Sequence, residues 1–224
     1  MVNVLLNYYN FHEDWAHDKL APYIKPDSKV TIVPYAYRDH EVACDADWQC
    51  LYGVNGEKYP NCIAPFLAYG IKEEDISWVN YFTDDSDISR KKIESADIVM
   101  FTGGLPEKIT ERLETKGLTD VVKNFNGVLI GVSAGAMFQF ATYHITPDDD
   151  YDSYGIYHGV GILDGFDLEV HYTHSEIQQQ CTQRALKELG VPVYAMYHCG
   201  GLLIADNHIT VMGDVDIHIN KNRN

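Results

Sequence analysis

The stretch 126-NGVLIGVSAGAMFQFAT-142 decides the fold that this sequence predicts. It passes from an uninterrupted apolar run, Val128 to Val132, directly into Ser133. A short apolar run that leads into a helix is typical of a strand in a parallel sheet covered on both faces. Ser133 would then stand at the carboxyl end of that strand, where open α/β sheets hold their functional sites.

The five residues from Gly131 to Gly135 match the nucleophile elbow, Gly-x-Ser-x-Gly. A serine on so sharp a turn has strained backbone geometry, and glycines two residues away on either side remove the colliding Cβ atoms. The structural alternative is a serine that only caps the next helix, because five-residue matches are common. The apolar run before Ser133 and the apolar helix after it favour a nucleophile.

Apolar and amphipathic segments alternate along the rest of the chain, which predicts a three-layer α/β sandwich with a mostly parallel central sheet. The predicted strands are Val2–Leu6, Lys29–Tyr37, Asp75–Phe82, Asp97–Gly104, Gly127–Val132, Asp167–Thr173 and Val191–Tyr197. The predicted helices are Ile63–Ile71, Asp87–Ala96, Leu105–Leu118, Ala134–Thr142 and Ser175–Gly190.

The chain end and two polar segments complete the predicted organisation of residues 1–224 as a single domain. Residues 201–214 read as a β-hairpin that turns at Asp206–His208. Residues 39–61 form a polar segment that we expect to be a long loop or insertion, either a lid or, more simply, a surface loop. Pro147–Gly155 is a second, acidic loop.

The composition excludes several classes of function. The net charge of −16 argues against nucleic-acid binding and against anionic membranes. The five cysteines are irregularly spaced, and no basic, apolar leader opens the sequence, so we expect a cytoplasmic protein with free thiols. No convincing set of metal ligands occurs, and we expect neither a metal nor another cofactor.

A serine nucleophile needs a base, and ten histidines are available. His171 lies near the end of the predicted strand Asp167–Thr173, and the carboxyl end of a parallel strand is on the same side of the sheet as Ser133. We therefore predict that His171 is the base, with His174 and His198 as the alternatives. The glycine pair in 101-FTGGLPEK-108 also ends a strand. The N–H of Gly103 or Gly104, together with that of Ala134, could form an oxyanion hole, although a generic βα turn would have the same sequence.

Three stretches together resemble one known family: 101-FTGGLPEKI-109, 130-IGVSAGAM-137 and 161-GILDGFDLEVHY-172. They are similar to the serine peptidases of the peptidase E (aspartyl dipeptidase) and cyanophycinase family, over about Lys29 to Gly213. The resemblance implies a class I glutamine amidotransferase-like, flavodoxin-like fold and hydrolysis of small peptides.

The same resemblance implies a role for individual residues. Ser133 matches the family serine and His171 the family histidine. Asp148 falls at the spacing of the family aspartate, although Asp149 and Asp150 stand beside it. Gly103 and Gly104 match the family's glycine turn.

The sequence also departs from the family at three places. Leu105 and Met137 stand where the family often has asparagine, and 197-YHCGG-201 stands where it often has an acidic residue. The peptide that is cleaved therefore stays open, as does the oligomeric state, for which we allow a homodimer. A group that binds an acidic side chain would be one of Arg38, Lys72, Lys108 and Arg184. Two other functions remain open, a serine esterase and an amidotransferase-like binding protein with a degenerate site.

Overall fold

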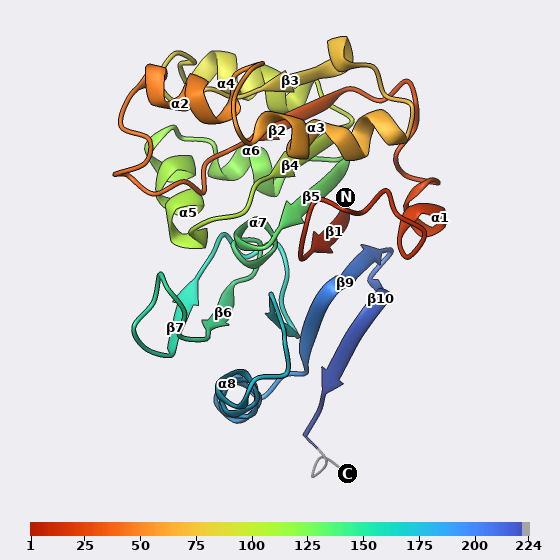
Figure 1. Ribbon diagram of the computed structural model, residues 1–224, viewed down its shortest axis with the longest axis vertical. Coiled ribbons are helices and arrows are strands. Elements are labelled where there is room, and N and C mark those ends of the chain that lie inside the picture. Colours follow the sequence, from red (N-terminus) through yellow and green to blue (C-terminus); the bar gives the residue numbers. More distant parts are fainter. Residues whose placement is uncertain (221–224) are drawn as a thin grey trace.

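The chain folds around one eight-stranded, mostly parallel sheet in the computed structural model, which describes residues 1–220 (Figure 1). The strand order is β10-β9-β1-β5-β4-β2-β3, and β8 pairs with β9 as well. Only the pairs β1–β9 and β9–β10 are antiparallel. The strands of this sheet are β1 Val2–Leu6, β2 Val30–Val33, β3 Ile76–Trp78, β4 Ile98–Phe101, β5 Val128–Val132, β8 Asp167–Glu169, β9 Val193–Ala205 and β10 His208–His218.

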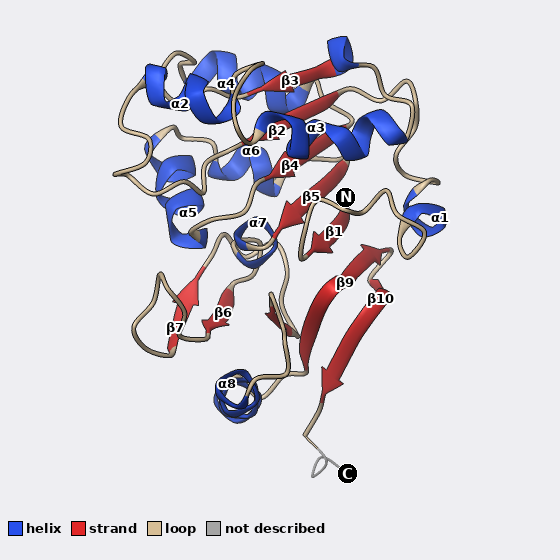
Figure 2. Cartoon of the chain, in the orientation of Figure 1, coloured by secondary structure: helices blue, strands red, loops and turns tan. Residues whose placement is uncertain are grey.

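Helices cover both faces of the sheet (Figure 2). One apolar cluster joins side chains of α1 and α3 to β1, β2, β4 and β5, and a second joins α4, α5 and α6 to the other face. β2, β4 and β5 are buried at every residue, as strands covered on both faces must be. The predicted three-layer α/β architecture is therefore confirmed. The helices are α1 His17–Leu20, α2 Asp45–Tyr52, α3 Tyr59–Ala68, α4 Ser86–Glu94, α5 Pro106–Thr115, α6 Thr119–Lys123, α7 Ala134–Met137 and α8 Glu176–Glu188, with a 3₁₀ turn at Glu73–Asp75.

The predicted C-terminal hairpin is also confirmed. β9 and β10 are antiparallel and are joined at Asp206 and Asn207. Both residues have positive φ angles, of 50° and 62°. Asp and Asn tolerate this conformation, which two-residue hairpin turns require.

The prediction of a long loop at residues 39–61 is wrong. This segment contains α2 and the first residues of α3. Trp48 and Tyr52 lie on the inner side of α2 and are only 4% and 1% exposed, in a cluster with Tyr37 and Val42. The segment therefore has an apolar core of its own, which its polar average composition conceals.

Several predicted elements end earlier than expected, among them β3, α7 and β8. β3 stops at Trp78 because the Asn80 side chain accepts hydrogen bonds from the N–H groups of Phe82 and Thr83 and so closes a turn. α7 stops at Met137, and the carbonyl of Phe138 accepts from the N–H of Val160 instead of continuing the helix. β8 stops at Glu169, two residues before a residue with positive φ.

The elements after α7 lie together in the lower part of the view in Figure 1, where β8, β9 and β10 form one edge of the sheet. β6 Thr142–Ile145 and β7 Gly155–His158 form a separate antiparallel pair, which the sequence had not indicated. α8 packs against β8, β9 and β10. Among residues 1–220, no helix has the length and apolar character needed to cross a membrane.

Candidate active site

Ser133 lies on the turn between β5 and α7, at the carboxyl end of the parallel strands. Its φ of 52° is rare for a residue with a side chain. A Cβ atom added to Gly131 would lie 1.9 Å from the carbonyl oxygen of Gly135, and one added to Gly135 would lie 2.3 Å from that of Phe101. The turn therefore has no room for a side chain at either glycine, which is the steric requirement of a nucleophile elbow.

The steric requirement gives a first prediction. Gly131→Ala should lower the free energy of unfolding by about 3 kcal/mol, because the new methyl group overlaps the Gly135 carbonyl and the backbone has to shift. Urea unfolding measures this value. Gly103→Ala is the matched control, since its Cβ would meet no atom closer than 3.4 Å. Equal stability of the two variants would contradict this account of the turn.

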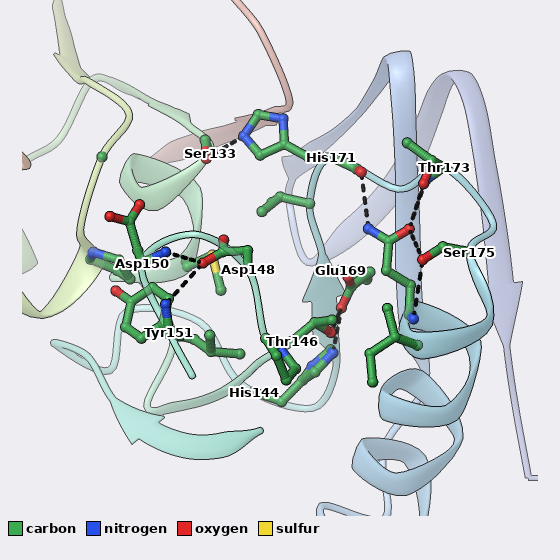
Figure 3. Close-up of a pocket in the computed structure, with 18 of the residues that line it drawn as sticks. Ser133, His144, Thr146, Asp148, Asp150, Tyr151, Glu169, His171, Thr173 and Ser175 are labelled. Atoms are coloured by element: carbon green, nitrogen blue, oxygen red, sulfur yellow. Dashed lines mark hydrogen bonds and ion pairs between the residues drawn. The ribbon is translucent and has the colours of Figure 1, made fainter. Parts of the chain in front are cut away.

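His171 reaches Ser133 from the loop that follows β8. Its Nε2 atom lies 2.8 Å from Ser133 Oγ, and Figure 3 shows the ring turned toward that hydroxyl. Ser133 is 8% exposed, so its hydroxyl stands at the base of an opening and not on the open surface. The structure thus brings together the two side chains that the sequence predicted as nucleophile and base.

The protein packed around the imidazole disfavours its charged form and lowers the pKa of His171 below the ordinary value of 6.5. The negative charges of Asp148 and Glu169 oppose this shift, and His198 adds to it. A neutral imidazole at neutral pH is the form that can accept a proton.

The two alternative bases are turned to other partners. The ring of His174 packs edge-on against Tyr172, and that of His198 packs against Tyr8. Within residues 1–220, neither histidine forms a hydrogen bond with Ser133.

The predicted acid is near His171 but not bonded to it. Asp148 Oδ1 accepts hydrogen bonds from the backbone N–H groups of Asp150 and Tyr151, at 2.8 and 3.1 Å (Figure 3). Asp150 forms a two-pronged ion pair with Arg38. Over the described part of the chain, no carboxylate hydrogen-bonds the His171 ring, and the sequence alternatives Asp149 and Asp150 are not joined to it either.

The glycine pair after β4 is split between two environments. The N–H of Gly103 donates to the hydroxyl of Tyr9, at 3.0 Å, and is already engaged inside the protein. Gly104 lines the cavity beside Ser133. Ala134 is the first residue of α7, where a backbone N–H has no acceptor within the helix. Among the contacts of residues 1–220, the N–H groups of Gly104 and Ala134 form no hydrogen bond, so these two of the three predicted oxyanion donors remain free to bind a substrate oxygen.

A cavity of about 460 Å³ opens in front of Ser133 and His171. Arg38, Asp148, Asp150 and Glu169 contribute charged groups to its lining. Of the four cations considered for binding an acidic side chain, Arg38 is the one that lines this cavity. Asp150 and Glu41 both hold its guanidinium, so its charge is already matched.

The wall of the cavity contains a buried ionic cluster that the sequence did not indicate. His144 on β6 is fully buried, and its Nδ1 lies 2.5 Å from Asp167. Its Nε2 lies 2.6 Å from Glu169 (Figure 3). Burial alone would lower the pKa of His144, but the two carboxylates outweigh it and raise the pKa to about 10. His144 is thus a buried cation between two anions. The sequence signal for this cluster was weak. Asp167 and Glu169 stand at alternate positions of β8, but the histidine that joins them is more than 20 residues away.

In the part of the chain that the structure describes, no three His, Cys, Asp or Glu side chains are grouped so that they could hold an ion.

A strained serine at the end of a parallel strand, with an imidazole at hydrogen-bond distance, is the arrangement expected of a hydrolase with a serine nucleophile. The model of peptidase family S51 matches residues 13–212. The chain therefore belongs to peptidase family S51, a family of serine peptidases.

Solved structures agree with this fold. A candidate peptidase E from Listeria monocytogenes EGD-e superposes with a TM-score of 0.66 at 16% identity, over 94% of this chain and 96% of that one. A peptidase from an acI-B1 actinobacterium gives a TM-score of 0.62 at 16% identity, over 97% of this chain and 89% of that one. A search of curated proteins finds no match to the sequence. At such low identity the two structures show a shared fold.

Proposed function

We propose that this serine peptidase hydrolyses short peptides by acyl transfer, with Ser133 as the nucleophile and His171 as the general base. The observation that carries the proposal is the 2.8 Å separation of Ser133 Oγ and His171 Nε2. His171 takes the hydroxyl proton while Ser133 attacks the peptide carbonyl carbon. It then protonates the leaving amine. In the second half, His171 takes a proton from water as the water attacks the acyl carbon, and returns that proton to Ser133 as the acid product leaves.

We assign the stabilisation of the oxyanion to the N–H groups of Ala134 and Gly104. Each such donor is typically worth roughly 3–4 kcal/mol of the barrier. Gly103 is left out of this pair because its N–H is hydrogen-bonded to Tyr9.

We assign an electrostatic role to Asp148. It lines the same cavity, and its negative charge favours a positive charge on His171. That charge develops on the imidazole in the transition state. Asp150 is a weaker candidate because Arg38 matches its charge.

The size of the cavity, about 460 Å³, suits a substrate of a few residues. A panel of Xaa-Leu dipeptides, run with the wild-type protein and with Ser133→Ala, tests the proposed activity. Matched ester substrates should be run beside it, because a serine esterase would cleave the esters and leave the dipeptides intact. A cytoplasmic location and a homodimer remain predictions, to be checked by cell fractionation and by light scattering.

The pH dependence of hydrolysis follows from the state of His171. The base works when it is neutral, and its pKa lies below 6.5. We therefore expect kcat/KM to be constant between about pH 7 and pH 8. Below the lowered pKa of His171, it should fall tenfold per pH unit. Rates measured between pH 4.5 and 8 test this. A midpoint above pH 7 would contradict the assignment of His171.

A further inference from the structure

The ring of His171 faces Ser133 without a carboxylate to hold it. In a Ser-His-Asp arrangement, a hydrogen bond from the acid to Nδ1 fixes the orientation of the imidazole. Here Asp148 accepts hydrogen bonds from the backbone of its own loop. Within residues 1–220, the imidazole of His171 forms a hydrogen bond only with Ser133. Another part of the protein must therefore hold His171 in place.

The backbone of His171 is in an unusual conformation that needs support. Its φ is 52°, a value that costs of order 1 kcal/mol or more for a residue with a side chain. Such a conformation persists only where the surrounding structure imposes it. Both backbone polar groups of His171 are in fact held by amide side chains, from two different elements.

Asn7 holds the N–H group from the sheet. It directly follows β1, is 1% exposed, and accepts from the His171 N–H through Oδ1 at 2.6 Å. Its Nδ2 donates to the carbonyls of Met196 and Tyr197 on β9, at 3.1 and 2.9 Å. The amide nitrogen of Asn7 is thus held by the sheet, which leaves its oxygen directed at His171, so Asn7 is a fixed anchor.

Gln178 holds the carbonyl group from the opposite side. It lies in the first turn of α8, and its Nε2 donates to the His171 carbonyl at 3.0 Å. Its Oε1 accepts from the N–H and the hydroxyl of Thr173, at 2.9 and 3.0 Å, and from the Ser175 hydroxyl at 3.2 Å. One side chain therefore connects His171, the turn after it and the start of a 13-residue helix.

We propose that Gln178 is a positioning residue for catalysis, which clamps the His171 backbone against the Asn7 anchor and so aims the imidazole at Ser133. The clamp supplies the orientation that an acid supplies in a Ser-His-Asp triad. This inference rests on the proposed roles of Ser133 and His171. It adds a residue that lies on the cavity wall, contacts the His171 backbone but neither the imidazole nor the Ser133 hydroxyl, and is still required for the rate.

The neighbouring Gln179 provides a matched control. Its Nε2 donates to the carbonyl of His174 at 2.9 Å, and His174 also has a positive φ, of 62°. Gln178 and Gln179 thus make the same type of bond, from the same helix turn, to two histidines in the same conformation. Only one of these histidines contacts Ser133.

The test compares Gln178→Ala, Gln178→Glu and Gln179→Ala. Gln178→Glu keeps the acceptor for Thr173 and Ser175 but removes the donor to His171. The first readout is the rate at which a fluorophosphonate modifies Ser133, since this rate depends on the aimed imidazole and needs no peptide. We expect both Gln178 variants to react about 10- to 100-fold more slowly than the wild type, because small displacements of catalytic groups lower rates by such factors. Gln179→Ala should react within twofold of the wild-type rate.

The second readout is kcat and KM on a cleaved dipeptide, with thermal unfolding as the check on the fold. We expect the Gln178 variants to lose kcat by the same factor, with KM within about twofold and a Tm close to that of Gln179→Ala. Equal labelling rates for Gln178→Ala and Gln179→Ala would overturn the positioning role. A wild-type protein that is labelled at Ser133 but cleaves no peptide would overturn the proposed function instead, and the labelling rates would still decide the inference.

Discussion

Ser133→Ala is expected to lower kcat for peptide hydrolysis at least about 10⁴-fold, because no other group can form the acyl intermediate. The fold should survive, since alanine keeps the Cβ atom and removes one oxygen from a residue that is 8% exposed. The measurement is kcat/KM on the best dipeptide, with thermal unfolding run in parallel.

Ser153→Ala is the control for this variant. Ser153 is exposed in the loop between β6 and β7, at a distance from the elbow in sequence. We expect it to keep wild-type activity. Retention of more than about 1% of the wild-type rate by Ser133→Ala would mean that another nucleophile carries the reaction.

His144→Leu is expected to have the largest effect on stability. The substitution leaves Asp167 and Glu169, which are 0% and 4% exposed, without the cation between them. Breaking a buried ion pair by removing one partner costs roughly 3–5 kcal/mol. Urea unfolding at pH 7 should show this loss. His158→Leu, on the neighbouring strand at an exposed position, should change the free energy of unfolding by less than about 1 kcal/mol.

The same cluster predicts how the wild-type stability depends on pH. The folded pKa of His144, about 10, lies above the value of 6.5 for an unperturbed histidine. Its contribution is therefore complete below pH 6.5 and is lost as the pH rises through about 10. The free energy of unfolding should fall between pH 7 and pH 10 in the wild type and less steeply in His144→Leu. Parallel curves for the two proteins would contradict a charged His144.

The local sequence was sufficient where steric rules are strict. The elbow from Gly131 to Gly135 could be predicted because a serine with positive φ leaves no room for nearby Cβ atoms. The hairpin at Asp206–Asn207 could be predicted because few residue types tolerate that turn. The position of His171 followed from the common direction of parallel strands.

The remainder depends on contacts between residues that are distant in the sequence. Nothing in the sequence around Gly103 indicates that Tyr9 occupies its N–H group. The spacing that pointed to Asp148 does not indicate that its carboxylate bonds its own loop. The buried side of α2, with Trp48 and Tyr52, lies in a segment whose average composition is polar. Asn7 belongs to no motif, and the helix-capping pattern 175-SEIQ-178 does not indicate that the Gln178 side chain bonds to His171.

The central claim is that His171 activates Ser133 for attack. The most direct measurement is the mapping of the residue that a fluorophosphonate modifies in the folded protein, with the wild type compared with His171→Ala. The account predicts that the wild type is modified at Ser133 and that His171→Ala reacts at least about 100-fold more slowly. Modification at another residue, no modification of the folded wild type, or an equal rate in both proteins would contradict it.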